Sequence, residues 1–266
     1  MRFGPLTLKL NIDPIRTMKP LVLYLLLLLC SGLPESTRAQ QYPESDPADQ
    51  KHILVFSKTN GFRHASIETG MDVLSDLAQQ EGILMDHTED SLQFNDANLS
   101  KYQLVVFLST TGDVLGAEQE KAFQKYVEDG GAFMGIHAAT DTEYGWSWYG
   151  ELVGAYFDSH PEQQEAELLV TNLEHPATAH MSPSWKHYDE WYNFKNINPD
   201  IQVLMMLNEK SYEGGKNGAN HPIAWFHEES GGRTFYTGLG HDETTFKNPV
   251  FREHLRGGLR YCLKIK

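Results

Sequence analysis

Short apolar runs alternate with segments of helical spacing in the first half of the chain beyond residue 50. A continuous apolar run bounded by turn-forming residues is typical of a strand buried on both faces, whereas apolar residues three and four apart indicate a helix. These patterns predict strands at 52–57, 83–87, 104–108 and 130–136, and helices from Ile67 to just before Gly82 and over 117–128. Elements in this order predict a mostly parallel sheet with helices on both faces.

The second half of the chain has a different pattern. Strands are predicted at 165–170, 201–207, 223–227 and 234–237, with a hairpin turn at Ser230-Gly231-Gly232 between the last two. Pro249 begins a terminal helix with Phe251, Leu255, Leu259 and Leu263 on one side. The predicted fold class is therefore α/β. We expect one domain over 51–266, with antiparallel additions to the sheet in its second half.

The first 39 residues have the features of an export signal. Met18-Lys19 gives a short positive region, 21–30 is an almost unbroken apolar run, and Thr37-Arg38-Ala39 offers a signal-peptidase site. The apolar run is short for a membrane span, and a polar linker follows at 40–50. We therefore expect an exported, periplasmic protein without a membrane span, whether translation begins at Met1 or at Met18.

Charge and cysteine content narrow the range of partners. The chain carries a formal net charge of −14, and the part after residue 39 is more acidic still, which disfavours binding to nucleic acid or to an anionic membrane. Cys30 ends the apolar run and makes a lipid anchor a minor alternative, although Leu29 stands where a small residue is preferred. Beyond residue 39 only Cys262 is left, so no intramolecular disulfide is expected there.

The segment 130–139 carries the most informative signal for function. It predicts an apolar strand that runs into a tight turn of small residues, with His137 at the turn. In α/β proteins with a nucleophile elbow, the residue at such a turn is exposed at the carboxyl edge of the sheet. Histidine is poorly suited to forming an acyl-enzyme, but it transfers protons and binds metals.

Other polar residues also follow predicted strands. Asn60, Arg63 and His64 come after the first strand, and His241 and Asp242 come after the last. Because carboxyl ends of parallel strands share one edge, we expect His64, His137 and His241 to converge there with an acidic neighbour. His160, Asp189 and Glu190 are the loop residues expected to join them. The alternative for His64 is a capping or solvent-facing role.

The segment 186–192 combines adjacent carboxylates with aromatic rings. Aromatic faces stack on sugars and carboxylates bind sugar hydroxyls, so Trp191 and Tyr192 are candidate carbohydrate contacts; a core aromatic cluster is the alternative. Adjacent residues of a strand face opposite sides, so one of Asp189 and Glu190 is expected to be structural.

A divalent metal is a further possibility. Two histidines and a carboxylate suffice for a catalytic metal with an open position. No pair of ligands at helical or hairpin spacing is present, so the metal is left as an alternative, without assigned ligands.

Together, these motifs resemble the ThuA-like (trehalose utilisation) family. The resemblance rests on 59–64, 130–139, Glu174-His175-Pro176, 189–192 and 238–241, and it covers essentially all of 52–263. It implies a class I glutamine amidotransferase-like (flavodoxin-like) fold, a three-layer sandwich, and a link to oxidised (3-keto) disaccharides or glycosides. His137 stands where amidotransferases have cysteine, so glutamine hydrolysis is not expected.

The predicted function is an exported enzyme that cleaves or isomerises a keto-sugar glycoside. His137 and His241 would act as general acid and base or as metal ligands, with Asp189 or Glu190 orienting a histidine. Arg63 and His64 would stabilise negative charge on oxygen. The expected substrate contacts are Asn60, Arg63, His160, Trp191, Tyr192 and Asp242. A non-catalytic carbohydrate-binding protein and a metal-dependent hydrolase are the alternatives, and the oligomeric state is left open.

Overall fold

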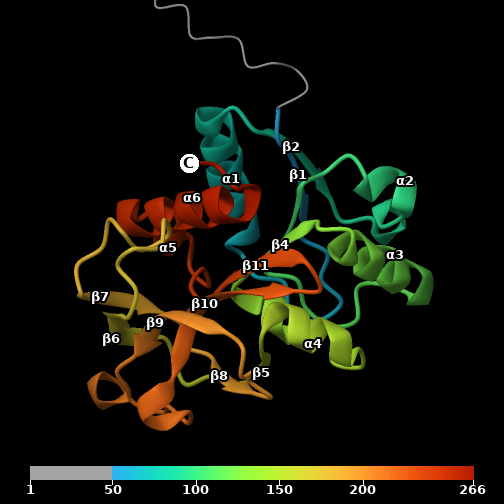
Figure 1. The fold of residues 1–266 in the computed structure, drawn as a ribbon. Coiled ribbons are helices and arrows are strands. Elements are labelled where there is room, and N and C mark those ends of the chain that lie inside the picture. The colour runs from blue at the N-terminus through green and yellow to red at the C-terminus, as the bar shows by residue number, and fades with distance from the viewer. Residues whose placement is uncertain (1–49) are drawn as a thin grey trace, which may run out of the picture. The chain divides into compact units, whose positions relative to one another are not determined.

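A computed structural model describes residues 50–266 (Figure 1). The strands are β1 (His52–Phe56), β2 (Leu84–Thr88), β3 (Leu104–Leu108), β4 (Ala132–Ile136), β5 (Tyr156–Ser159), β6 (Gln164–Val170), β7 (Ser184–Asp189), β8 (Asn193–Lys195), β9 (Gln202–Leu207), β10 (Pro222–Glu229) and β11 (Gly232–Thr237). The α-helices are α1 (Ile67–Glu81), α2 (Asp96–Leu99), α3 (Ala117–Glu128), α4 (Ser147–Val153), α5 (Glu243–Lys247) and α6 (Pro249–Leu263).

The main sheet has nine strands in the order β2-β1-β3-β4-β11-β10-β9-β6-β7. The first five are parallel, with β1 pairing β3 from Ile53 opposite Leu104 and β4 pairing β11 up to Ile136 opposite Thr237. The remaining neighbours are antiparallel. The mostly parallel α/β sheet and its antiparallel additions in the second half are therefore confirmed.

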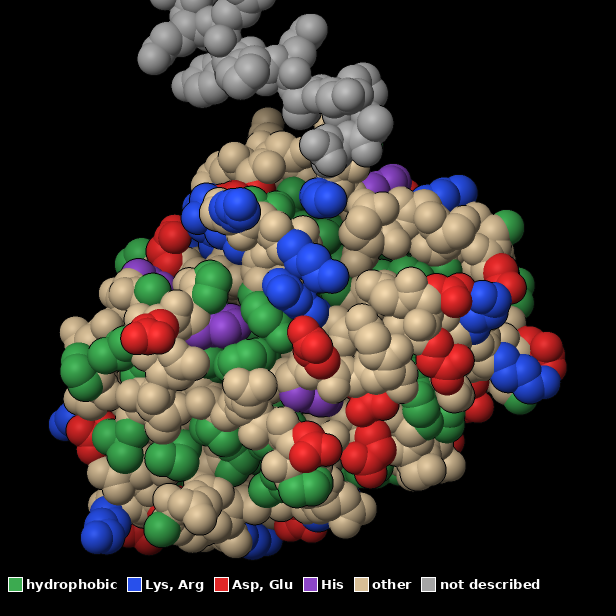
Figure 2. All heavy atoms as spheres, viewed as in Figure 1, with side chains coloured by type: hydrophobic (Ala, Val, Ile, Leu, Met, Phe, Trp, Pro, Cys, Tyr) green, Lys and Arg blue, Asp and Glu red, His purple; other side chains and the backbone are tan. Residues whose placement is uncertain are grey.

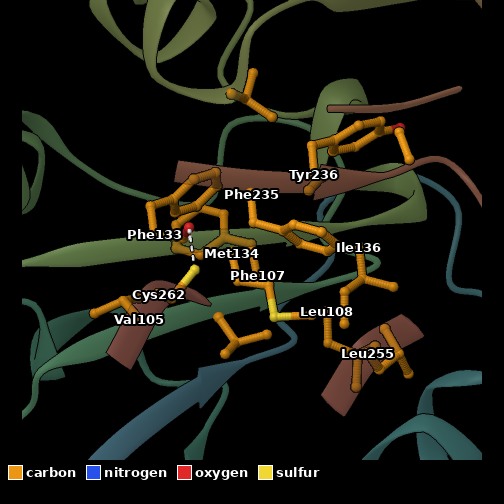
Figure 3. Close-up of a cluster of buried hydrophobic side chains, with 14 of the residues drawn as sticks. Val105, Phe107, Leu108, Phe133, Met134, Ile136, Phe235, Tyr236, Leu255 and Cys262 are labelled. Carbon is orange, nitrogen blue, oxygen red and sulfur yellow. Dashed lines mark hydrogen bonds between the residues drawn. The ribbon is translucent and has the colours of Figure 1, made fainter. Parts of the chain in front are cut away.

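Helices cover both faces of the parallel half (Figure 1). One layer contains α1, α5 and α6, which contact one another, and α3 and α4 lie on the opposite side. Strands β3 and β4 are buried throughout, as their continuous apolar runs predict. Figure 3 shows this core, where rings from β3, β4 and β11 pack together and the buried Cys262 thiol of α6 lies 3.6 Å from the Phe133 carbonyl oxygen.

Several elements were not predicted from the sequence. Strands β5 and β8 form a separate two-stranded sheet, and β7 is the outermost strand of the main sheet. β7 alternates exposed and partly buried positions along a polar sequence, so it lacks the apolar run that marks the central strands. The hairpin turn was predicted correctly: Ser230 and Gly231, between β10 and β11, both have positive φ.

The expectations for the start of the chain lie outside the described residues. These are the export signal at 1–39, the alternative lipid anchor at Cys30, and residues 40–49 of the predicted linker 40–50. Among residues 50–266, no helix combines the length and the apolar character needed to cross a membrane. Figure 2 shows acidic and basic side chains interspersed over one face of the described part.

A buried ion pair joins α1 to α6, and its loss is expected to destabilise the fold. The Glu81 carboxylate accepts from Arg256 at 2.9 Å and from Arg260 at 2.9 and 3.0 Å, and its side chain is 7% exposed. We expect Glu81→Gln to lower the free energy of unfolding by about 1–3 kcal/mol in urea titrations. The control Glu253→Gln, which removes an exposed partner of Arg256, is expected to change it by under about 0.5 kcal/mol.

The Glu81 effect has a defined pH dependence. Burial raises the pKa of Glu81, but the hydrogen bonds from Arg260 and Arg256 outweigh it and lower the pKa below its usual value. A carboxyl group with a depressed folded-state pKa stabilises the fold above its unfolded pKa, and this stabilisation is lost as the pH falls through the folded pKa. The difference between parent and Glu81→Gln should therefore shrink in acid, and an equal difference at all pH values would contradict the assignment.

Candidate functional site

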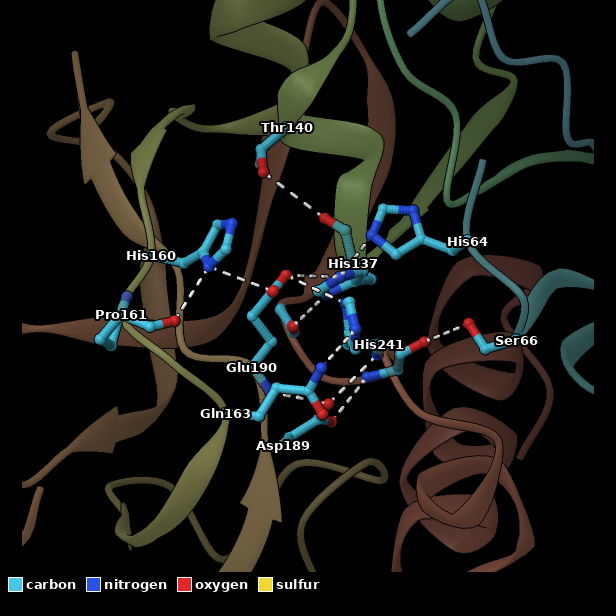
Figure 4. A network of polar contacts seen from close by, with 12 residues as sticks. His64, Ser66, His137, Thr140, His160, Pro161, Gln163, Asp189, Glu190 and His241 are labelled. Atoms are coloured by element: carbon cyan, nitrogen blue, oxygen red, sulfur yellow. Dashed lines mark hydrogen bonds and ion pairs between the residues drawn. The ribbon is translucent and has the colours of Figure 1, made fainter. Parts of the chain in front are cut away.

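Three histidines from three different strand ends meet at the carboxyl edge of the parallel sheet (Figure 4). His64 lies in the loop after β1, His137 follows β4 directly, and His241 follows β11 by a short loop. Glu190, the residue after β7, reaches the same place. One ligand atom from each of the four lies within 4.8 Å of all the others. The structure thus confirms the prediction that these three histidines lie close together beside an acidic side chain.

His137 occupies a strained turn that fixes its ring. Its φ is 50°, in the left-handed region that is unfavourable for a side-chain-bearing residue. The Tyr236 hydroxyl donates to the His137 carbonyl at 2.7 Å and helps to hold this conformation. The His137 Nδ1 lies 2.8 Å from the Gly238 carbonyl oxygen, which can only accept, so Nδ1 carries a proton. In the neutral ring, Nε2 therefore presents a lone pair to the cluster.

His64 is buried and neutral. Its Nε2 lies 3.2 Å from His137 Nε2, and its ring is edge-on to the rings of His137 and His241. Burial lowers the pKa of His64 to about 2, and the neighbouring His137 and His241 act in the same direction. His64 is therefore not a cation that stabilises negative charge, and the capping or solvent-facing alternative is also wrong because the side chain lies inside the cluster.

Glu190 connects the buried histidines to an exposed one. Its Oε2 lies 3.0 Å from His241 Nδ1 and 3.6 Å from His137 Nε2, while its Oε1 lies 3.1 Å from His160 Nδ1. Burial raises the pKa of Glu190, but the interactions with the neighbouring His137 and His241 outweigh it and lower the pKa below the usual range. Burial in turn lowers the pKa of His241, and the bond to Glu190 outweighs this and raises it. Glu190 is thus an ionised carboxylate.

Asp189 faces away from the cluster and organises its backbone. Its carboxylate oxygens accept from the backbone N–H groups of Glu190 at 2.9 Å, Gly240 at 2.9 Å and His241 at 3.2 Å. The side chain is fully buried. Of the two adjacent carboxylates, Glu190 therefore points into the site and Asp189 positions the two segments that meet there.

Four other predicted site residues lie outside the cluster. Arg63 pairs with Glu68 at 2.9 Å and Glu89 at 2.8 Å on the surface, so its charge is already matched elsewhere. The Asn60 side chain donates to the Asp113 carbonyl, and Asp242 accepts from the Thr244 N–H as the N-cap of α5. Trp191 is buried, and its indole N–H donates to the Gln164 carbonyl. The structure brings none of these side chains to Glu190.

Tyr192 and His160 form the wall on one side of the cluster. The Tyr192 ring lies 4.4 Å from the His137 ring and is buried. The His160 side chain is 44% exposed, and its Nδ1 lies near two groups that only accept, Glu190 and the Pro161 carbonyl at 2.9 Å. The Nδ1 proton is therefore used, and the neutral ring keeps a lone pair on the exposed Nε2.

Two residues of the site were missed from the sequence. The Gln163 side-chain amide lies 2.8 Å from His241 Nε2. Phe62 is 65% exposed, edge-on to His64, and lines a hollow of about 360 Å³ beside His241. Nothing in the pattern around Gln163 marks it, whereas Phe62 is a large apolar residue in an otherwise polar turn, a signal that could have been used.

The arrangement supports proton transfer and metal binding rather than acyl transfer. The turn that would carry a cysteine or serine nucleophile carries His137, and Cys262 lies in the core on α6 instead. Imidazole lone pairs and one ionised carboxylate are concentrated at a single point. The turn therefore lacks the thiol or hydroxyl nucleophile that glutamine hydrolysis through a covalent intermediate uses.

Comparison with known proteins shows what this chain is similar to. A family model described as "ThuA: Trehalose utilisation" matches residues 52–262. The search of curated proteins returned no match. A solved structure described as ThuA-like, from Bacteroides uniformis ATCC 8492, is 24% identical with a TM-score of 0.70, covering 83% of this chain and 95% of its own.

Two further solved structures share the fold at lower identity. One, described as ThuA-like, comes from Parabacteroides merdae ATCC 43184 and is 20% identical, with a TM-score of 0.67 over 82% of this chain and 91% of its own. The other is described as a cytoplasmic protein from Salmonella typhimurium LT2 and is 14% identical, with a TM-score of 0.59 over 79% of this chain and 99% of its own. At sequence identities below 25%, these three structures show that the fold is shared and nothing more.

Proposed function

We propose that this chain, which belongs to the ThuA (trehalose utilisation) family, is an enzyme that cleaves or isomerises an oxidised (3-keto) disaccharide or glycoside at the Glu190 cluster. The observation that carries this proposal is an exposed imidazole, His160, held by a buried ionised carboxylate beside a group of buried histidines. We further propose that the protein acts after export, because 1–39 has the sequence features of a signal.

His160 is the residue best placed to move a proton. His137 and His64 are buried, and His241 is directed at Glu190 and Gln163, whereas the His160 side chain is 44% exposed and its Nε2 keeps a lone pair. The hydrogen on the carbon next to a ketone is acidic enough for such a base. In a 3-keto-glycoside, His160 would take the C2 proton, the C1–O bond would break as a C1–C2 double bond forms, and the proton would pass to the leaving oxygen.

The hollow beside His241 suits a sugar ring. Phe62 presents a mostly exposed ring there, and Asp242 and Lys247 supply polar groups at its edge. A pyranose can place its CH face on the aromatic ring and direct its hydroxyls to the polar groups. The hollow reaches the cluster at His241, so a disaccharide bound there would extend toward the histidines.

The test is turnover of 3-keto-trehalose, followed by NMR and by chromatography of the products. We expect the parent protein to consume it and His160→Gln to lower kcat by about 10²- to 10⁴-fold, the usual contribution of a general base. The control His180→Gln, at an exposed histidine bonded to the Val250 carbonyl, is expected to keep the parent rate.

Two results would overturn this proposal at different levels. Binding of the sugar by calorimetry without any product would favour a non-catalytic carbohydrate-binding protein. Full turnover by His160→Gln would leave the enzyme assignment in place and remove His160 from the proton transfer.

A further inference from the structure

The buried part of the cluster gathers several atoms that can bind a cation. His137 Nε2 presents a lone pair because its Nδ1 proton is held by Gly238. That lone pair lies 3.6 Å from a carboxylate oxygen of Glu190 and 3.2 Å from His64 Nε2. Imidazole nitrogens and a carboxylate oxygen that converge on one buried point form an arrangement that a bound cation would fit.

We propose that His64, His137, His241 and Glu190 bind one divalent transition-metal ion. The ligand atoms are the two Nε2 atoms of His64 and His137, Nδ1 of His241, and a carboxylate oxygen of Glu190. Three of their separations, 3.0, 3.2 and 3.6 Å, bracket about 3.4 Å, the spacing of ligand atoms around a tetrahedral ion with bonds of about 2.1 Å, and all four atoms lie within 4.8 Å of one another. Small side-chain movements would therefore complete the coordination of an ion.

The surroundings hold the donors in orientations that suit a metal. The Gly238 carbonyl fixes the His137 tautomer, as partners of metal-bound histidines commonly do. Gln163 can do the same for His241 by turning its amide, so that its oxygen accepts from Nε2 and Nδ1 is left as the ligand. Asp189 fixes the backbone of Glu190 and of His241. His137, His241 and Glu190 are thus anchored independently of the ion, whereas His64 Nδ1 has no hydrogen-bond partner among the described residues.

The donor set also indicates which ions fit. Three imidazole nitrogens and one carboxylate oxygen favour Zn²⁺, Co²⁺ or Fe²⁺ over Mg²⁺ and Ca²⁺, which prefer oxygen ligands. With four protein ligands a tetrahedral ion would have no open position, so it would act as a Lewis acid on a carbonyl or hydroxyl oxygen of the sugar only by taking that oxygen as a fifth ligand. The proposal deepens the proposed function, because it concerns the same site, but metal binding can be measured without any sugar.

Metal binding is tested on the full protein after treatment with a chelator and its removal by dialysis. Zn²⁺ is titrated by calorimetry, and Co²⁺ by its visible absorption, which reports four-coordinate geometry. We expect one ion per chain, an affinity reduced at least about 100-fold in His241→Asn and in Glu190→Gln, and no competition by equimolar Mg²⁺. His180→Asn, which removes an exposed histidine outside the cluster, is expected to bind like the parent.

Near-UV circular dichroism and the thermal midpoint show whether each variant is folded. Zn²⁺ should raise the thermal midpoint of the parent and of His180→Asn but not that of His241→Asn. The metal assignment fails if the chelated parent takes up no Zn²⁺ or Co²⁺, or if His241→Asn and Glu190→Gln both bind as tightly as the parent. A parent that binds one ion yet leaves 3-keto-trehalose intact would keep the metal site and reject the proposed substrate.

Discussion

Glu190→Gln is expected to lower the turnover of 3-keto-trehalose by about 10³-fold, an effect of the same order as the loss of the general base His160. The carboxylate holds His160 through one oxygen and His241 through the other, at 3.1 and 3.0 Å. Glutamine keeps the shape but offers one accepting oxygen, and its amide N–H₂ cannot accept from an imidazole N–H. The variant thus loses the charge and the orientation of at least one ring, which kcat measured with saturating substrate would register.

The matched control for Glu190→Gln is Glu165→Gln, which neutralises an exposed carboxylate on β6. It changes the net charge by the same amount and is expected to keep the parent kcat. Because Glu190 is nearly buried and its removal could affect folding, both variants are compared by urea unfolding before assay. A folded Glu190→Gln protein with the parent kcat would show that the cluster is not where the reaction takes place.

The strand pattern predicted where the functional residues would lie better than it predicted what they contact. The central strands were recognisable because strands buried on both faces need continuous apolar runs, and β3 has the bounds expected from the sequence. Parallel pairing then fixes the strand ends at one edge, which is why His64, His137 and His241 could be expected together without knowledge of any contact.

Side-chain partners in loops were beyond the sequence pattern. Arg63 neighbours His64 in the chain, yet it turns outward to Glu68 and Glu89, because a charged side chain gains more from solvent and exposed partners than from a buried cluster of neutral rings. Trp191 follows Glu190 but is buried with its indole N–H satisfied by a carbonyl. Hydrophobic periodicity carries no information on such choices, which depend on contacts distant in sequence.

The same limit applies to β7. Alternation along a strand predicted that Asp189 and Glu190 could not share one role, and the structure agrees. Which of the two faces the histidines was not predictable, because β7 is an edge strand of polar sequence that pairs only with β6. The choice is set by the Gly240-His241 backbone, whose N–H groups lie against Asp189.

Asp189→Asn is expected to lower the free energy of unfolding by about 3 kcal/mol, the largest effect on stability that we predict. The fully buried Asp189 carboxylate accepts three backbone N–H hydrogen bonds through its two oxygens. The asparagine side chain has only one oxygen that can accept them. Its amide N–H₂ would face a backbone N–H, leaving a buried donor without a partner at a cost of about 1–3 kcal/mol, added to the loss of charge-assisted bonds. Urea unfolding measures this difference.

A stability loss alone would fit any buried aspartate, so the positioning role of Asp189 needs a second measurement. At a temperature where the variant is folded, Zn²⁺ affinity and kcat should both fall, because the backbones of Glu190 and His241 lose their common anchor. Asp200→Asn, at an exposed carboxylate, serves as the control and should leave stability, affinity and kcat unchanged. A folded Asp189→Asn protein with the parent Zn²⁺ affinity and kcat would mean that the cluster geometry is held by β4 and β11 without help from β7.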